Sequence, residues 1–351
     1  MAHTALHLWA ASGETRVGSY NGAETPLIFG DVNSELAALH SGCGVFPLTW
    51  RSKIRVAGKD RVRWLHNMVT NNVRELPVNR GNYDFVLNAQ GRILGDMYIY
   101  NRGEFFTLDT DSAQVEPLLT AMKRFIIMDK VEMAPEDGIA AIGICGPQAA
   151  RVLAEAGCNA LEMQPLEVRE RTLEGTAITI VSGPQQKPGW FEIWLDPAKA
   201  PELWARLVNS GAKPVGAEAL EMWRVLRGIP QYGQDIRDRD LPQETEQMQA
   251  LNFNKGCYIG QEIVERIRSR GQVHRKFSGF IFGDQIPAAG KYESEGRAFA
   301  EITTIASVPL SEGKKNLGLG YVRREMLASG AKIDLNGLEA TVVDLPFEIG
   351  I

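Results

Sequence analysis

The sequence predicts an α+β protein, made of two mixed units followed by a part that is entirely β. A strand pattern, a glycine and an amphipathic helix pattern follow one another twice, first after Trp50 and again after Ile139. Further strand and helix patterns come after each of them. After Arg270 the chain changes to short alternating runs broken by turns that contain glycine. This last pattern is typical of a small β-barrel or a sandwich.

The first unit begins with WRSKIRV, residues 50–56, which alternates as a strand does. GKDRVRWLHNMVTNNV then places Val62, Leu65 and Val69 on one helical face, and Asp60 is suited to cap that helix. The strand patterns YDFVLN, GDMYIYN and EFFTLDTD and the helical SAQVEPLLTAMKRF follow.

The second unit begins with IAAIGIC, residues 139–145, and a helix over GPQAARVLAEAG that Gly157 ends. AITIVS and WFEIWLD read as strands and APELWARLVNS as a helix. The GxGxxG spacing of a dinucleotide site is absent, so a Rossmann cofactor site is not expected.

The expected division of the chain has four segments. Residues 1–137 form the first α+β unit and residues 138–250 the second, with chain exchange between these two allowed. Residues 251–271 hold the motif KGCYIGQE and its helix, and residues 272–351 form the β part. Between the mixed units and the β part, RGIPQYGQDIRDRDLPQETE is rich in proline, glycine and charge and reads as an ordered loop near a cleft.

Composition excludes several classes of partner. A formal net charge of -5 argues against nucleic acid as a partner. The four cysteines, Cys43, Cys145, Cys158 and Cys257, form no CxxC pair, so neither a disulfide framework nor a metal site is expected. The N-terminal residues lack the pattern of a signal peptide, and no apolar run is long enough for a membrane span. We therefore expect a cytoplasmic protein with no membrane partner.

KGCYIGQE, residues 255–262, is the stretch that most needs an explanation. The spacing of Ile259, Ile263 and Ile267 predicts a helix from Tyr258 onward, with Cys257 at its start. Helix amides and the charge of Lys255 would then favour ionisation of the thiol. The alternative is that Cys257 is a small buried hydrophobe beside glycines that shape a turn. The residues alone leave both interpretations open.

KGCYIGQE, continued by Arg266, Arg270 and Gly271, resembles the motif of the YgfZ-type folate-binding proteins, which are related to the glycine-cleavage T-protein family. LHNMVTNNVREL, NAQGRILGDMYIYN, WFEIW and RVLRGIPQYGQDI are similar to landmarks of that family in the same order. The resemblance implies a three-part ring of two mixed α/β units and a C-terminal small β-barrel. It also implies a pocket for tetrahydrofolate or another reduced folate.

The resemblance also implies individual roles. Asp96 of GRILGD matches an aspartate that serves folate chemistry in the aminomethyltransferases, and Glu192 of WFEIW matches a glutamate that grips the pterin ring. Cys257 and Asp96 are the candidate catalytic residues. Two features depart from the T-protein pattern: GExGxE is reduced to KPGWFE, and Leu220 replaces an arginine. Besides Asp96 and Glu192, the candidate folate-binding residues are Tyr83, Trp190, Lys255, Gly256, Tyr258, Gly260, Gln261 and Glu262.

Three functions follow as hypotheses. The first, taken from the YgfZ resemblance, is a folate-binding protein that supports iron–sulfur cluster assembly or repair, with client or scaffold proteins as partners. The second is a tetrahydrofolate-dependent aminomethyltransferase, in which the folate receives an aminomethyl group from a carrier protein and Asp96 manages the proton. The third makes Cys257 a nucleophile with His274 as its base, although no cysteine-hydrolase motif accompanies them.

Overall fold

The computed structural model describes residues 15–184, 189–271, 273–310, 313–326 and 330–348. The chain divides into two compact units. The first comprises Met1–His66, Asn72–Asp84 and Met97–Leu220, and the second comprises Asn67–Asn71, Phe85–Asp96 and Glu221–Ile351. The four-segment division expected from the sequence stays a prediction.

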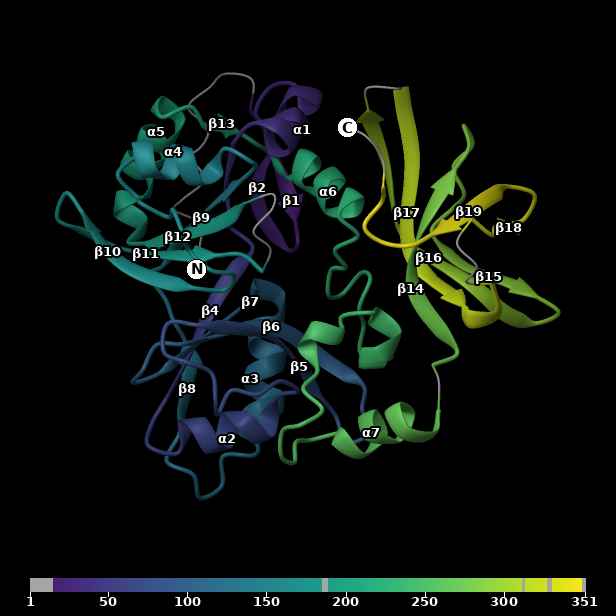
Figure 1. Cartoon of the computed structure of the whole chain (residues 1–351), viewed down its shortest axis with the longest axis horizontal. Coiled ribbons are helices and arrows are strands. Elements are labelled where there is room, and N and C mark those ends of the chain that lie inside the picture. The colour runs from purple at the N-terminus through teal and green to yellow at the C-terminus, as the bar shows by residue number, and fades with distance from the viewer. Residues whose placement is uncertain (1–14, 185–188, 272, 311–312, 327–329, 349–351) are drawn as a thin grey trace. The chain divides into compact units, whose positions relative to one another are not determined.

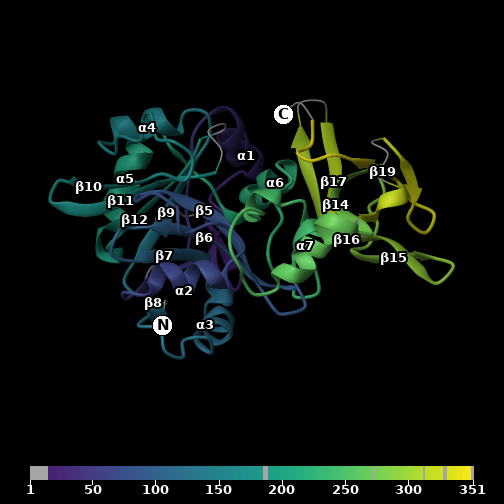
Figure 2. The same cartoon turned by 60° about the horizontal axis from the view of Figure 1, so that its bottom comes forward.

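The first unit contains a six-stranded sheet in the order β10-β11-β12-β9-β3-β13. Helices α4 and α5 lie on one face of this sheet in both views (Figure 1 and Figure 2). Ile144, Ile180 and Ile193 of the sheet and Leu153 and Leu207 of the helices share one buried core, which fixes that packing. The elements are β3 (Gly44–Pro47), β9 (Ala140–Cys145), α4 (Ala149–Glu155), β10 (Val168–Leu173), β11 (Thr176–Ser182), β12 (Trp190–Leu195), α5 (Ala200–Asn209) and β13 (Lys213–Pro214).

A second sheet has the strand order β5-β6-β7-β4-β8. Trp194 of β12 and Tyr100 of β6 belong to one small apolar cluster, so the face of the six-stranded sheet opposite the helices packs on this second sheet. The elements are β4 (Arg51–Ala57), α2 (Arg61–Met68), β5 (Gly81–Leu87), β6 (Ile93–Asn101), β7 (Phe106–Asp111), α3 (Val115–Lys123) and β8 (Glu132–Pro135). Residues 85–96, from β5 to the start of β6, are counted with the second unit.

The N-terminal elements of the first unit were not expected from the sequence. Asp31 caps α1 by accepting a hydrogen bond from the Ser34 amide. Glu35, which is 1% exposed, accepts hydrogen bonds from the amides of Phe29, Gly30 and Gly216 at 2.8–2.9 Å. Three backbone donors therefore satisfy this buried carboxylate. The elements are β1 (Arg16–Tyr20), β2 (Ala23–Ile28) and α1 (Val32–Ser41).

The second unit is built on an antiparallel sheet in the order β15-β16-β17-β14-β19-β18, which curls on itself in Figure 1. Phe280, Ile302, Val322 and Val342 lie in its buried core. The short alternating runs of the sequence are thus strands, as expected. The elements are α6 (Ala217–Leu226, which spans both units), η4 (Pro242–Thr245), α7 (Gln261–Arg270), β14 (Arg275–Phe282), β15 (Gly290–Ser294), β16 (Arg297–Leu310), β17 (Gly313–Arg323), β18 (Lys332–Asp334) and β19 (Glu339–Val343).

Within the described part of the chain, no helix has the length and apolar character needed to cross a bilayer. The prediction that there is no signal peptide concerned residues 1–20, of which residues 1–14 lie outside the described residues.

Candidate functional site

Two neighbouring strands of the first unit carry matched charges. β4 and β7 pair so that Lys53 stands opposite Asp109 and Arg51 opposite Asp111. Lys53 Nζ lies 2.6 Å from Asp109 Oδ1, while Arg51 contacts Asp109 Oδ2 at 2.7 Å and Asp111 Oδ1 at 2.9 Å. The side chains of Lys53 and Asp109 are 2% and 1% exposed. Each charge therefore depends on its partner, because water does not reach it.

Glu192 enters this cluster from β12. Its Oε2 accepts a hydrogen bond of 2.8 Å from Trp194 Nε1 and lies 3.8 Å from Lys53 Nζ. The same ammonium lies 4.4 Å from the centroid of the Trp194 ring, a cation–π distance. The other carboxylate oxygen, Oε1, accepts no hydrogen bond from any residue that the structure describes. The Glu192 side chain is 12% exposed, so part of it is accessible to an external donor.

Burial and charge act against each other in this cluster. Burial raises the pKa of the Glu192 carboxyl, the charge of Asp109 adds to the rise, and Lys53 and Arg51 oppose it. Burial would raise the pKa of Asp109 as well, but Arg51 and Lys53 outweigh it and hold that pKa below its usual range. Burial, with the charges of Asp109 and Glu192, raises the pKa of Tyr100 well above its usual value. The cluster thus holds a firmly ionised Asp109 and a Glu192 whose charge depends on Lys53.

A row of aromatic rings lies beside the carboxylates. Tyr83 stands 5.1 Å from Tyr98, Tyr98 is stacked 6.5 Å from Tyr100, and Tyr100 meets Trp194 edge-on at 5.5 Å between ring centroids. Tyr83 and Tyr98 are half-buried, so each keeps some exposed ring surface. Flat rings beside a carboxylate oxygen that can accept a hydrogen bond suit a flat nitrogen heterocycle with N–H donors. Trp190, by contrast, packs 5.0 Å from the ring of Phe46.

Asp96 lies on β6 and belongs to the second unit, whereas Glu192 belongs to the first. Asp96 is half-buried, and Tyr232 lies close to it. Burial, followed by the charge of Asp96, raises the pKa of the Tyr232 phenol to about 12, so the phenol stays protonated near neutrality. It donates a hydrogen bond of 2.9 Å to the carbonyl of Leu94, two residues before Asp96. Tyr232 therefore steadies the strand that carries Asp96.

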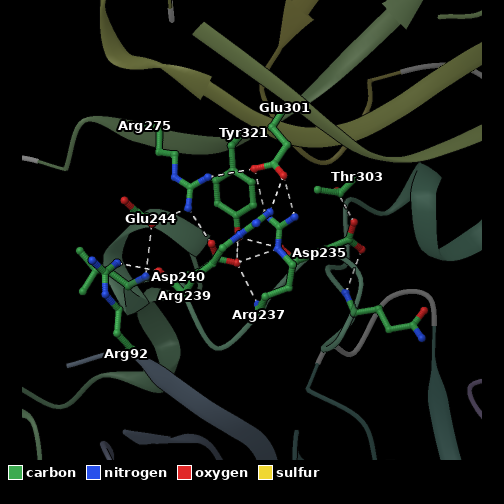
Figure 3. A network of polar contacts seen from close by, with 12 residues as sticks. Arg92, Asp235, Arg237, Arg239, Asp240, Glu244, Arg275, Glu301, Thr303 and Tyr321 are labelled. Atoms are coloured by element: carbon green, nitrogen blue, oxygen red, sulfur yellow. Dashed lines mark hydrogen bonds and ion pairs between the residues drawn. The ribbon is translucent and has the colours of Figure 1, made fainter. Parts of the chain in front are cut away.

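The loop 227–246 is held by the network in Figure 3. Arg237 binds both oxygens of Glu301 at 2.9 and 3.2 Å, and Arg275 contacts Asp240 at 2.6 Å and Glu301 at 3.1 Å. The loop is also hydrogen-bonded to β6, because the amide of Ile93 donates to the carbonyl of Asp240 at 3.2 Å. Each of these carboxylates already binds an arginine of the chain. We therefore interpret this network as the support of an ordered loop, as expected, and not as a ligand site.

Arg224 of α6 binds groups of the chain itself. It is 8% exposed and already engaged: it contacts Asp235 at 2.6 Å and Glu221 at 2.6 Å, and it donates to the carbonyl of Ile229 at 2.7 Å.

Lys255 and the residues around it connect the motif to neighbouring backbone. Lys255 is 7% exposed and donates to the carbonyls of Val69 at 2.6 Å and Asn71 at 2.7 Å, with its ammonium 5.0 Å from the ring centroid of the buried Tyr258. Gln261 accepts from the Tyr258 amide at 3.3 Å. Gly256 and Glu262 are exposed. The binding roles expected for these residues stay predictions.

Cys257 does not stand at the start of the helix as expected. Gly260 adopts a positive φ of 83°, and α7 begins only at Gln261, so Cys257 lies in the irregular segment before that turn. We expected the free amides at the start of the helix to favour the thiolate of Cys257. These amides belong to the residues after Gly260 and not to the segment that contains Cys257. Cys257 is exposed, which also rules out the alternative that it is a buried hydrophobe. Among the described residues it makes no hydrogen bond to His274, and no group of three or more His, Cys, Asp or Glu side chains could hold a metal ion.

Comparison with known proteins identifies the family. The model of the GCVT N-terminal domain matches residues 6–255, which is more than half of the chain. The chain belongs to the GCVT N-terminal domain family. Relatives named aminomethyltransferase from Rubrobacter xylanophilus and Caldanaerobacter subterraneus are 29% and 26% identical, each over 95% of this chain and over 90% and 92% of their own length.

The fold of this GCVT family member is that of a solved relative. The crystal structure of glycine cleavage system aminomethyltransferase T from Bartonella henselae matches with a TM-score of 0.84 and 22% identity, covering 95% of this chain and 94% of the other. The predicted fold class, two mixed α/β parts and a C-terminal β part of T-protein type, is confirmed by this match.

The first functional hypothesis needs correction. We expected a role in iron–sulfur cluster assembly from the motif KGCYIGQE, but the relatives from Rubrobacter xylanophilus and Caldanaerobacter subterraneus, which match 95% of the chain, are named aminomethyltransferase. The expectation of an iron–sulfur function is therefore wrong, and the second hypothesis takes its place.

Proposed function

We propose that this GCVT family member is a tetrahydrofolate-dependent aminomethyltransferase. The observation that supports the proposal most is the match, over 95% of the chain, to relatives named aminomethyltransferase. Two candidate residues fit the chemistry: Glu192 offers one oxygen beside a row of aromatic rings, and Asp96 supplies a half-buried carboxylate on β6. YgfZ-type membership is a finer assignment that rests on KGCYIGQE and stays a prediction.

The proposed reaction moves a one-carbon unit from a carrier protein to the folate. The methylene carbon of a sulfur-bound aminomethyl group leaves the carrier sulfur and the amine, and it forms bonds to two folate nitrogens. The hydrogens that these nitrogens lose are those that complete the carrier thiol and the released ammonia. We assign Asp96 to proton transfer in these steps, because a fixed carboxylate can accept and return a proton. Glu192 is assigned to the pterin ring, where its free oxygen would accept an N–H bond.

Calorimetric titration with tetrahydrofolate tests this proposal before any turnover is measured. Wild type is expected to bind, and Glu192→Ala to bind at least about tenfold more weakly, since a charged hydrogen bond is worth about 1.5–3 kcal/mol. Asp96→Ala should retain more of the affinity, because its assigned role is proton transfer. The matched control is Glu202→Ala on the exposed face of α5, which should bind as wild type does. No detectable binding by wild type at millimolar ligand would overturn the proposal.

A further inference from the structure

The cluster around Glu192 contains a residue whose role the proposed function does not explain. Lys53 is a buried ammonium on β4, 2.6 Å from Asp109 and 3.8 Å from Glu192. Asp109 is also paired with Arg51 at 2.7 Å, so Lys53 is not its only cationic partner. Burying a second cation beside Arg51 is costly unless a further carboxylate compensates it.

The further carboxylate near Lys53 is Glu192. Its Oε2 has two neighbours, the Trp194 indole at 2.8 Å and the Lys53 ammonium at 3.8 Å. Two groups on one oxygen fix the orientation of the carboxylate plane, which leaves Oε1 as the oxygen available to an external donor.

We propose that Lys53 is a positioning residue, which keeps the Glu192 carboxylate ionised and oriented so that Oε1 can accept an N–H donor of a reduced pterin ring. The inference rests on the proposed function for the identity of the ligand. It adds to that function the claim that Lys53 determines how strongly the pterin is bound near neutral pH.

The charged and titratable groups that face Glu192 come from three strands besides its own. β4 contributes Arg51 and Lys53, β7 contributes Asp109, and β6 contributes the phenol of Tyr100. Burial and Asp109 raise the pKa of Glu192, whereas Lys53 and Arg51 lower it. Removal of the Lys53 charge should therefore leave Glu192 protonated over a wider pH range, and removal of the Asp109 charge should do the opposite.

The test is the pH dependence of tetrahydrofolate affinity, measured by anaerobic calorimetry from pH 5 to 9 on the full chain. In wild type, affinity should be lost as the pH falls and Glu192 takes up its proton. In Lys53→Met that loss should begin at a higher pH, so affinity at pH 7 falls at least about tenfold and recovers toward pH 9, since one pKa unit corresponds to a tenfold change. Asp109→Asn should move the loss to lower pH.

Two further variants separate charge from packing. Arg55→Met removes an equal charge two residues along the same strand, where the side chain is 43% exposed, and should leave affinity and pH profile unchanged. Lys53→Arg keeps the charge and should restore the wild-type profile. Urea unfolding of each variant will show which are folded under the conditions of titration.

Certain results would overturn the inference. One is an affinity of Lys53→Met within twofold of wild type at pH 7. Another is a loss of affinity by the same factor at every pH, which a packing defect would cause. A shift of Lys53→Met and Asp109→Asn in the same direction would also contradict it. Titration of the Glu192 carboxyl by ¹³C NMR in the ligand-free protein, assigned with Glu192→Gln, tests the effect of Lys53 without any folate. If wild type binds no tetrahydrofolate, the proposed function fails, while this titration still decides whether Lys53 sets the charge of Glu192.

Discussion

Gly260 packs directly against Asn88: a Cβ added to Gly260 would lie 2.5 Å from the Asn88 carbonyl oxygen. Its φ of 83° is one that side chains with a Cβ rarely adopt. The glycine before α7 is thus required by the turn at residues 88–91.

Gly260→Ala should therefore destabilise the protein more than an ordinary glycine substitution. The matched control is Gly175→Ala, because Gly175 has a φ of 84° and no heavy atom within 4 Å of the added Cβ. We expect Gly175→Ala to cost about 1 kcal/mol of unfolding free energy and Gly260→Ala at least about 2 kcal/mol more, the difference being the backbone clash. Urea denaturation measures both, and equal losses would contradict the close approach.

Asp109→Ala should cost about 3–5 kcal/mol of unfolding free energy, because it leaves Arg51 and Lys53 buried with less compensation. Asp111→Ala is the matched control, since Asp111 is 13% exposed and contacts Arg51 alone; it should cost much less. A loss for Asp109→Ala no greater than that for Asp111→Ala would show that the buried pairing contributes little.

The same carboxylate predicts a pH dependence of stability. The folded state holds the pKa of Asp109 below its unfolded value of about 3.9, so its contribution is present above that pH and is lost as the pH falls through the folded pKa. Urea unfolding between pH 7 and pH 2.5 should therefore show wild type and Asp109→Asn converging in stability at acidic pH. A constant difference between them would contradict the assignment.

Lys255→Met should destabilise the protein by about 1–3 kcal/mol, because the carbonyls of Val69 and Asn71 would each lose a buried donor. Lys276→Met serves as control: that lysine is 33% exposed and pairs with Glu246, so its loss should cost less than about 1 kcal/mol. If Lys255→Met is as stable as wild type, the structural assignment of Lys255 is wrong.

Cys257 is the exposed one of the four cysteines. Burial raises the pKa of the Cys43 thiol to about 12 and that of Cys158 to about 11. These two thiols are therefore protected from reagents both by burial and by a low thiolate fraction. Native protein should thus react quickly with one equivalent of a disulfide reagent such as DTNB, and Cys257→Ser with none. Because the proposed transfer uses no thiol of the chain, Cys257→Ser should keep the transfer rate within about twofold. A rate that falls a hundredfold would assign Cys257 to the reaction.

Much of the fold could be predicted because local patterns and tertiary structure agree. WRSKIRV became β4, IAAIGIC became β9, and the helix after it ends just before Gly157, which has a φ of 84°. The start of α7 was placed too early, since the spacing of Ile259, Ile263 and Ile267 also fits the turn at Gly260. Periodicity did not reveal that this glycine packs against the turn at residue 88.

The sequence of β4 alone does not show that its charged residue Lys53 is buried. On β4, alternation places Lys53 with Arg51 and Arg55 on the polar face, which ordinarily faces solvent. Glu192 and Trp194 of the six-stranded sheet lie beside Lys53 on that face, and the lysine is buried. One signal was available: in EFFTLDTD, Asp109 and Asp111 alternate with the spacing of Lys53 and Arg51, as expected of strands that pair with complementary charges. Tyr232 left no such signal, because its contact to Leu94 joins distant parts of the sequence.

The most direct test of the proposed activity is the formation of methylenetetrahydrofolate from tetrahydrofolate and a lipoyl carrier protein loaded with an aminomethyl group. Wild type should form product well above the uncatalysed background, and Asp96→Asn should form it about a hundredfold more slowly or worse, as loss of a general acid–base group predicts. Folded wild-type protein that binds the folate but yields no product above background would contradict the account.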